Sequence, residues 1–504
     1  MAQGQQFQYI EKVIVAEPTK LDWVFPLLEK SPPVTPEALV KETTRGGRFE
    51  YEFFGPREGD AGGGAWPLVI FVSPQDRPVG WDFWAPTCEA HGVLFAGVRE
   101  AGNGIAVSRR VRATLEVLDD VRRRYRVDPE RTYLAGFSGG AFIACRVAFA
   151  VPEYVGGVVC IGDAPQLPAD PWARQRLRER LSLAIVCGAR EPAGPMVEEL
   201  DGPMFQAAGV RAETLILPRQ GHTMPDAAVM ERAFGWLEQG VEARRETKAR
   251  LPLTSMGQTL SREECSAAML EEARERFQKP ATTGEGLWEL EAIVKRWSDL
   301  PAAGDAQGMI TENAAKSERP WEAEQRRRQQ RVERAEAEGY ERLASRGEPA
   351  LKKQRANLLQ LATQHWETLA KQTDDAELQA EAVKRLAGLR ELAAKPPAAG
   401  EKEMAAVAMK DVRFQLVGEV TLAEGVDRFR QVLAQLGYEL TVDANALPII
   451  AAGGERKIKL DLPAATYNDV DRRFFRRHGL KLVRKGNAIQ LLAMEPKAEA
   501  ESSR

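Results

Sequence analysis

The hydrophobic and polar positions of this chain follow three different patterns in succession. Between residues 48 and 240, short apolar runs alternate with amphipathic stretches. Runs that are apolar throughout are typical of parallel strands, which a sheet covered by helices buries on both faces. The strongest runs are Leu68–Val72, Val93–Val98, Thr132–Ala135, Val158–Ile161, Leu183–Cys187 and Thr214–Leu217. This alternation predicts an α/β domain with a mainly parallel sheet and helices on both faces.

The second pattern, over residues 241–395, contains no convincing strand. Two segments, Ser261–Phe277 and Gly286–Trp297, have apolar residues at helical spacing. Trp321–Ala394 is rich in Ala, Glu, Lys, Arg, Gln and Leu, a composition typical of long helices. No heptad is sustained, so the segment predicts repeat-like helices or a helical stalk.

The third pattern, over residues 411–493, predicts a small α+β unit. Thr421 and Glu424 have the spacing of a capping box before an amphipathic helix. Tyr438–Val442 and Lys457–Leu462 alternate between apolar and polar residues, as half-buried strands do. The predicted order is βαββαββ.

These patterns divide the chain into six segments. We expect the following: an N-terminal extension over 1–47, the α/β domain over 48–240, the helical region over 241–395, a linker over 396–410, the small α+β domain over 411–493 and a disordered tail over 494–504.

Composition narrows the possible partners. The 504 residues have a net charge of −3, which provides no general attraction for nucleic acid. No apolar run approaches the ~18 residues of a membrane helix, and residues 1–6 do not resemble a signal peptide. We therefore expect neither a nucleic-acid partner nor a membrane span. The expected location is cytoplasmic, or extracytoplasmic if a signal was removed.

The five scattered cysteines form no C-x-x-C pair and predict no metal site, and no cofactor motif is present.

The most informative motif is G-F-S-G-G at residues 136–140, which follows an apolar run and opens a helix-like stretch. A serine between close glycines on a strand-to-helix turn is the nucleophile elbow of α/β-hydrolases. Residues 127–140 resemble the elbow region of esterases related to polyhydroxybutyrate depolymerases and feruloyl esterases. The resemblance covers about residues 48–240. It implies a serine hydrolase, most simply a carboxylic-ester hydrolase that needs no cofactor.

A serine hydroxyl needs a base to remove its proton. Of the four histidines, only His222 lies on the loop after the last predicted strand of the α/β domain, where the resemblance places the catalytic histidine. The resemblance also implies an acid between Ser138 and His222 that orients the imidazole. Glu191 occupies the position where such hydrolases usually have aspartate, and Asp163 and Asp201 are the alternatives.

An oxyanion hole requires two donors. The resemblance implies the backbone N–H of Gly139 as one donor and an N–H after strand 68–72 as the other. Pro74 has no N–H in that loop, which leaves Gln75, through either its backbone or its side chain. The nearby aromatic residues would either line a substrate pocket or cover the edge of the sheet; they are Trp81, Phe83 and Trp84.

The C-terminal unit resembles the small N-terminal domains of secretins and the related STN domains, which implies binding of a protein partner through residues 241–493. Two functional hypotheses result. The first is a serine esterase, acting through an acyl-enzyme on a small or polymeric ester, with attached partner-binding regions. The alternative is a degenerate hydrolase fold that acts as a scaffold for protein assembly.

Overall fold

The computed structural model describes residues 7–21, 48–56, 65–250, 259–314, 319, 321–394, 414–435, 438–454, 456–485 and 488–494. The predicted linker 396–410, nearly all of the predicted tail 494–504 and most of the predicted extension 1–47 lie outside these residues. The chain divides into two compact units. The first comprises Met1–Cys187, Ala193–Ile216 and Met224–Ala399, and the second comprises Gly188–Pro192, Leu217–Thr223 and Gly400–Arg504.

The centre of the first unit is an eight-stranded sheet with the order β1-β2-β4-β3-β5-β6-β7-β8. The strands β3 to β7 pair in parallel, and β1 and β2 form an antiparallel edge. The strand β1, which precedes residue 48, belongs to this sheet. The strands are β1 (Phe7–Ile14), β2 (Glu50–Pro56), β3 (Trp66–Val72), β4 (Leu94–Val98), β5 (Val127–Phe137), β6 (Gly157–Ile161), β7 (Ser182–Gly188) and β8 (Arg211–Leu217).

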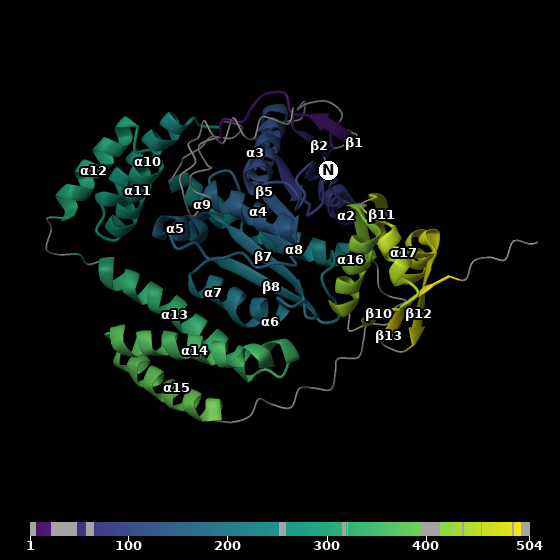
Figure 1. Ribbon diagram of the computed structural model, residues 1–504. Coiled ribbons are helices and arrows are strands. Elements are labelled where there is room, and N and C mark those ends of the chain that lie inside the picture. The colour runs from purple at the N-terminus through teal and green to yellow at the C-terminus, as the bar shows by residue number, and fades with distance from the viewer. Residues whose placement is uncertain are drawn as a thin grey trace, which may run out of the picture. The chain divides into compact units, whose positions relative to one another are not determined.

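Helices cover both faces of the sheet because its order reverses at β3. The connection from β3 to β4 runs toward one edge and that from β4 to β5 runs toward the other, so right-handed crossovers put their helices on opposite faces. Accordingly, α2 packs against α8, whereas α3, α4 and α5 pack in a row (Figure 1). The helices are α2 (Trp81–His91), α3 (Val107–Arg124), α4 (Gly139–Ala150), α5 (Pro171–Arg180), α6 (Gly194–Met196), α7 (Gly202–Ala207) and α8 (Ala227–Gln239).

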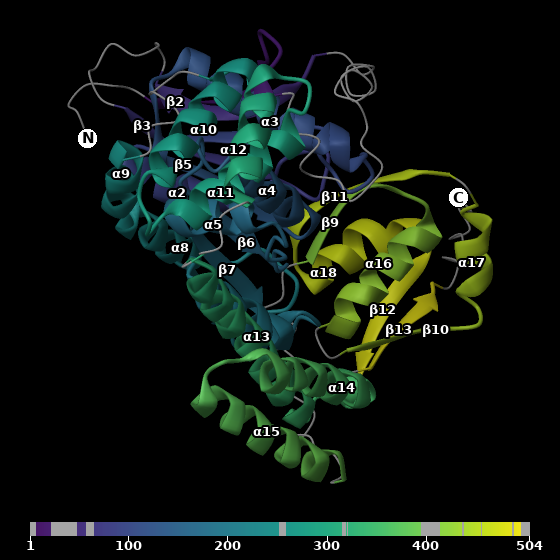
Figure 2. The ribbon, with the colours of Figure 1, turned by 90° about the vertical axis from the view of Figure 1, so that its left-hand side faces the viewer.

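The segment after α8 is helical throughout its described residues. Its helices are α9 (Val241–Arg250), α10 (Arg262–Phe277), α11 (Thr283–Arg296), α12 (Pro301–Ala314), α13 (Trp321–Ser345), α14 (Pro349–Gln372) and α15 (Ala376–Ala394). The helix α11 packs on α5, and α13 packs on α7, so the segment is built onto the α/β domain. Figure 2 shows α13, α14 and α15 as successive neighbours. None of the described helices is long and apolar enough to cross a membrane.

The C-terminal part of the second unit is a small α+β fold. The strands β10, β13 and β12 form one sheet, and β11 pairs with β9 in another. The capping box of Thr421 and Glu424 forms as predicted, with both reciprocal hydrogen bonds present. The elements are β9 (Phe414–Val420), α16 (Leu422–Gln435), β10 (Glu439–Val442), α17 (Leu447–Ala452), β11 (Ile458–Ala465), α18 (Tyr467–Val470), β12 (Leu480–Lys485) and β13 (Ala488–Ala493). The fold class predicted from the sequence, with its three successive parts, is therefore confirmed.

A buried network of charges joins the α/β domain to α10 and α11. The Arg176 side chain on α5 has no exposed surface and lies 2.7 Å from Glu272 Oε1 and 3.1 Å from Glu289 Oε1. Burial raises the pKa of Glu272, but the charge and hydrogen bond of Arg176, together with its other neighbours, outweigh burial and lower that pKa to about 2. Arg176, together with Arg276 on α10, thus supplies the countercharge for buried carboxyl groups on two helices.

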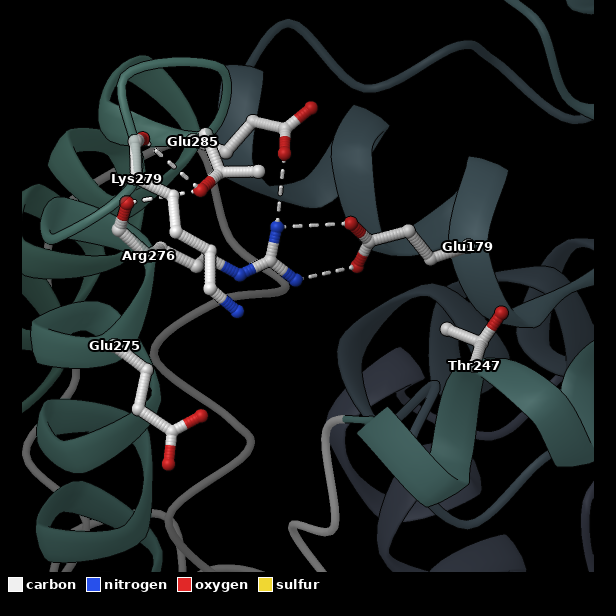
Figure 3. Close-up of a pocket in the computed structure, with 7 residues that line it drawn as sticks. Glu179, Thr247, Glu275, Arg276, Lys279 and Glu285 are labelled. Atoms are coloured by element: carbon white, nitrogen blue, oxygen red, sulfur yellow. Dashed lines mark hydrogen bonds and ion pairs between the residues drawn. The ribbon is translucent and has the colours of Figure 1, made fainter.

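A pocket of about 490 Å³ adjoins this network (Figure 3). Arg276 on α10 extends to Glu179 on α5, with nitrogen–oxygen distances of 3.0 and 3.1 Å, and its Nη1 lies 3.1 Å from Glu285. The charges of these three residues are therefore paired across the pocket. None of Ser138, Glu191 and His222 lines it.

We expect Arg176→Ala to destabilise the protein by about 3–5 kcal/mol, because it removes one of the two guanidinium groups that meet the buried Glu272 and Glu289 and leaves Arg276 to pair with both. Urea denaturation followed by circular dichroism measures this loss. The matched control is Arg274→Ala on α10, whose half-exposed ion pairs contribute about 0–1 kcal/mol. Equal stability of the two variants would contradict the assigned role of the buried network.

Candidate active site

Ser138 lies between β5 and α4 with a backbone conformation that L-residues rarely adopt. Its φ is 53° and its ψ is −128°. Among the described non-glycine residues, only Ser138 and Glu100 have a positive φ. Such strain persists only where the surrounding structure enforces it, and it is concentrated at functional sites.

Two glycines make this turn possible. A Cβ on Gly136 would lie 2.4 Å from the carbonyl group of Gly140, and a Cβ on Gly140 would lie 2.0 Å from the carbonyl oxygen of Val72. Both obstacles are backbone atoms, so making room for a side chain would require the backbone to shift. The Ser138 N–H donates to the carbonyl of Ile161 on β6 at 2.8 Å, which fixes the turn to the sheet. The glycine spacing of the motif therefore reflects close backbone packing.

Glu191 and His222 are hydrogen-bonded to one another. His222 Nδ1 lies 2.6 Å from Glu191 Oε2, and the glutamate side chain is 3% exposed. The other carboxylate oxygen, Oε1, accepts the Gly188 N–H at 2.8 Å. These contacts fix the rotation of the carboxylate and favour the imidazole tautomer that has its proton on Nδ1.

Backbone hydrogen bonds between the loops after β7 and β8 bring these two side chains together. The Ala189 N–H donates to Leu217 and the Arg190 N–H donates to Gln220, both at 3.0 Å. A Cβ on Gly188 would lie 2.3 Å from the carbonyl oxygen of Gln220, so the approach requires glycine there. The position of Glu191 thus follows from backbone pairing.

Asp163, one of the alternative acids, follows β6, and its Oδ1 accepts the Ala164 N–H at 2.8 Å. Asp201 lies in the π-helical turn Val197–Asp201. Burial, and then the charge of Asp163, raises the pKa of Asp201 to about 7. Asp163 therefore has a second carboxyl group as a neighbour.

In the loop after β3, the backbone N–H of Gln75, the predicted oxyanion donor, is already hydrogen-bonded. The Gln75 N–H donates to the Ser73 hydroxyl at 3.1 Å, and the carboxamide oxygen of Gln75 is buried without a hydrogen-bond partner among the described residues.

Asn103, on the loop after β4, lies next to the elbow. A Cβ on Gly139 would lie 2.1 Å from Oδ1 of Asn103. The sequence analysis did not identify Asn103, because its loop after β4 carries no motif and only the fold brings it to the elbow.

The three aromatic residues differ in their surroundings. The Trp81 ring packs on Phe54 and Phe95, with centroids 4.5 and 5.4 Å away. Trp84 is fully buried, and Phe83 is half-buried. Trp81 thus covers strands β2 and β4, and Trp84 is part of the core.

Comparisons with known proteins give a local match. No protein-family model matches the chain. Over 150 residues the chain is 31% identical to a putative esterase, NocK, of Nocardia uniformis subsp. tsuyamanensis. That match covers 30% of this chain and only 40% of the relative.

Similar solved structures include three esterases or related hydrolases. The S-formylglutathione hydrolase FrmB of Staphylococcus aureus is 12% identical, with a TM-score of 0.32, over 47% of this chain and 98% of its own. The esterase of the hyperthermophilic archaeon Pyrobaculum calidifontis is 16% identical, with a TM-score of 0.30, over 41% and 89%. A ferulic acid esterase is 13% identical, with a TM-score of 0.30, over 48% and 99%.

We expect Gly136→Ala to destabilise the protein by about 1–3 kcal/mol, because the added methyl group meets the backbone of Gly140. Thermal or urea unfolding measures the change. The control is Gly235→Ala on α8, where a Cβ meets nothing within 4 Å and helix propensity predicts a gain of about 0.5–1 kcal/mol. A Gly136→Ala protein as stable as wild type would show that the turn has room to relax.

Proposed function

We propose that this protein is a serine hydrolase, most simply a carboxylic-ester hydrolase, with a triad of Ser138, His222 and Glu191. The observation that carries the proposal is the 2.6 Å contact between His222 Nδ1 and Glu191. These two residues lie on the loops after β8 and β7, and the strained Ser138 follows β5 of the same sheet. In parallel sheets, functional side chains gather at the carboxyl ends of the strands. The local similarity to a putative esterase supports the same class.

Each residue has a distinct role in the proposed reaction. His222 Nε2 removes the proton of the Ser138 hydroxyl as its oxygen attacks the carbonyl carbon, and then gives that proton to the departing alcohol. Glu191 holds the imidazole through Nδ1 and stabilises its positive charge. The Gly139 N–H stabilises the oxygen that becomes negative. Water, activated by the same histidine, then hydrolyses the acyl-enzyme and regenerates Ser138.

A second candidate function is that of a non-catalytic scaffold, in which the helical and C-terminal parts bind a protein partner. The loop after β3 favours this candidate, because Pro74 has no N–H and that of Gln75 is already bonded to Ser73. The strained Ser138 and the bonded Glu191–His222 pair favour the enzyme, since a scaffold has no need of either.

A fluorophosphonate probe distinguishes the two candidates. We expect the wild-type protein to be labelled, Ser138→Ala to take no label, and His222→Ala to react roughly 10²–10⁴-fold more slowly because its general base is missing. Mass spectrometry locates the label. The control is His91→Gln, since His91 lies on α2 paired with Glu231 and should leave labelling unchanged. Folded wild-type protein that takes no label at Ser138 would support the scaffold.

The identity of the acid is tested by graded substitutions at Glu191. Glu191→Gln keeps the shape but loses the charge that stabilises the imidazolium, so we expect turnover of p-nitrophenyl butyrate to fall by up to about 10⁴-fold. Glu191→Asp, which is one methylene shorter, should lie between this variant and wild type. If Asp163→Asn abolishes turnover and Glu191→Gln does not, Asp163 is the acid.

A further inference from the structure

The proposed reaction lacks a second donor for its oxyanion. One backbone donor is Gly139, and the loss of one of two donors lowers the rate by roughly 10²–10³-fold. In the loop after β3, Pro74 has no N–H and the Gln75 N–H donates to Ser73 Oγ at 3.1 Å, so the side chain of Gln75 is what remains of that predicted donor. Another group near Gly139 therefore has to be considered.

The carboxamide of Asn103 lies beside Gly139, on the side where a Cβ would be. An ideal Cβ on Gly139 would lie 2.1 Å from Oδ1, 2.9 Å from Cγ and 3.1 Å from Nδ2 of Asn103. The Asn103 carboxamide therefore lies directly beside Gly139. The nitrogen and oxygen of an asparagine exchange places by rotation about its last torsion, so Nδ2 can take either position.

Asn103 is available to a substrate. Its side chain is exposed, and its carboxamide forms no hydrogen bond to any residue of the described chain. The carboxamide is therefore open to solvent, and an oxygen that develops negative charge beside Gly139 can accept a hydrogen bond from it. An amide N–H₂ group is among the side-chain donors that stabilise such oxyanions.

The loop that carries Asn103 is held firmly. The Asn103 N–H donates to the carbonyl of Pro74 at 2.9 Å, and the Glu100 N–H donates to that of Asp76 at 2.7 Å. A Cβ on Gly102 would lie 2.8 Å from the Asp76 backbone nitrogen, so the two loops are in close contact. Glu100 has a φ of 52°, a strained conformation that redirects the chain after β4. These contacts fix the backbone from which the Asn103 side chain projects, so the carboxamide is held near Gly139 even though its last torsion can rotate.

We propose that Nδ2 of Asn103 is the second oxyanion donor, acting together with the Gly139 N–H. The inference rests on the proposed serine-hydrolase function. When Ser138 Oγ forms its bond to the carbonyl carbon, the π electrons of the carbonyl move onto its oxygen, which accepts both N–H hydrogen bonds. No proton is transferred to that oxygen, and the electrons return when the alcohol leaves.

The test compares p-nitrophenyl butyrate hydrolysis by full-length wild type, Asn103→Ala and Asn103→Asp. Loss of a donor that acts only in the transition state lowers kcat by roughly 10²–10³-fold and changes KM by less than about threefold. Asn103→Asp keeps the shape but places a carboxylate beside the developing charge, so its kcat falls at least as far. Melting temperatures should be unchanged because the side chain is exposed. Asn357→Ala, an exposed asparagine on α14, is the control and retains wild-type kcat.

Three outcomes would overturn the inference, and they are distinguishable. If Asn103→Ala retains kcat within about threefold of wild type and Gln75→Ala loses about 100-fold, the second donor is Gln75. If Asn103→Asp restores the kcat and melting temperature lost in Asn103→Ala, the residue has a packing role only. If wild-type protein neither hydrolyses the ester nor takes a fluorophosphonate label, the proposed function fails, and the inference fails with it.

Discussion

The backbone at Ser138 is held in a conformation that its own side chain disfavours, and the surrounding contacts offset the energy of that strain. The carbonyl oxygen of Val72 and the backbone of Gly140 approach so closely that only glycine fits at residues 136 and 140. The N–H of Ser138 is fixed to β6 at the same time. A serine placed in this way stands above the end of β5 with α4 starting directly after it. The candidate chemistry depends on this constraint, because a relaxed turn would not hold the hydroxyl in place.

The pair of Glu191 and His222 is positioned by the same kind of backbone contact. Glu191 and His222 are 31 residues apart in the sequence, and hydrogen bonds between their loops bring the two side chains within 2.6 Å. Gly188 allows the loops to approach and also donates its N–H to the carboxylate. Glutamate, one methylene longer than aspartate, fits this arrangement because its carboxylate extends back to that N–H while still meeting the imidazole.

The helical segment is attached to the α/β domain by charges as well as by apolar packing. Arg176 and Arg276 meet Glu272 and Glu289 in an almost fully buried network that spans α5, α10 and α11. Removing one partner from such a network costs far more than a surface ion pair contributes, because the remaining charges stay buried. This network holds α10 and α11 on the domain that carries the elbow.

The sequence by itself determined the alternation of strands and helices, the elbow and the capping box, because these depend on local periodicity and on residues close together along the chain. It could not determine which acid meets His222, since Glu191 and Asp163 both follow strands of the sheet. It gave no indication of Asn103 beside Gly139 or of Arg176 among three helices. The tertiary structure decided these, because each contact joins segments that only the order of the strands and the packing of the helices bring together, and spacing along the chain carries no information about that distance.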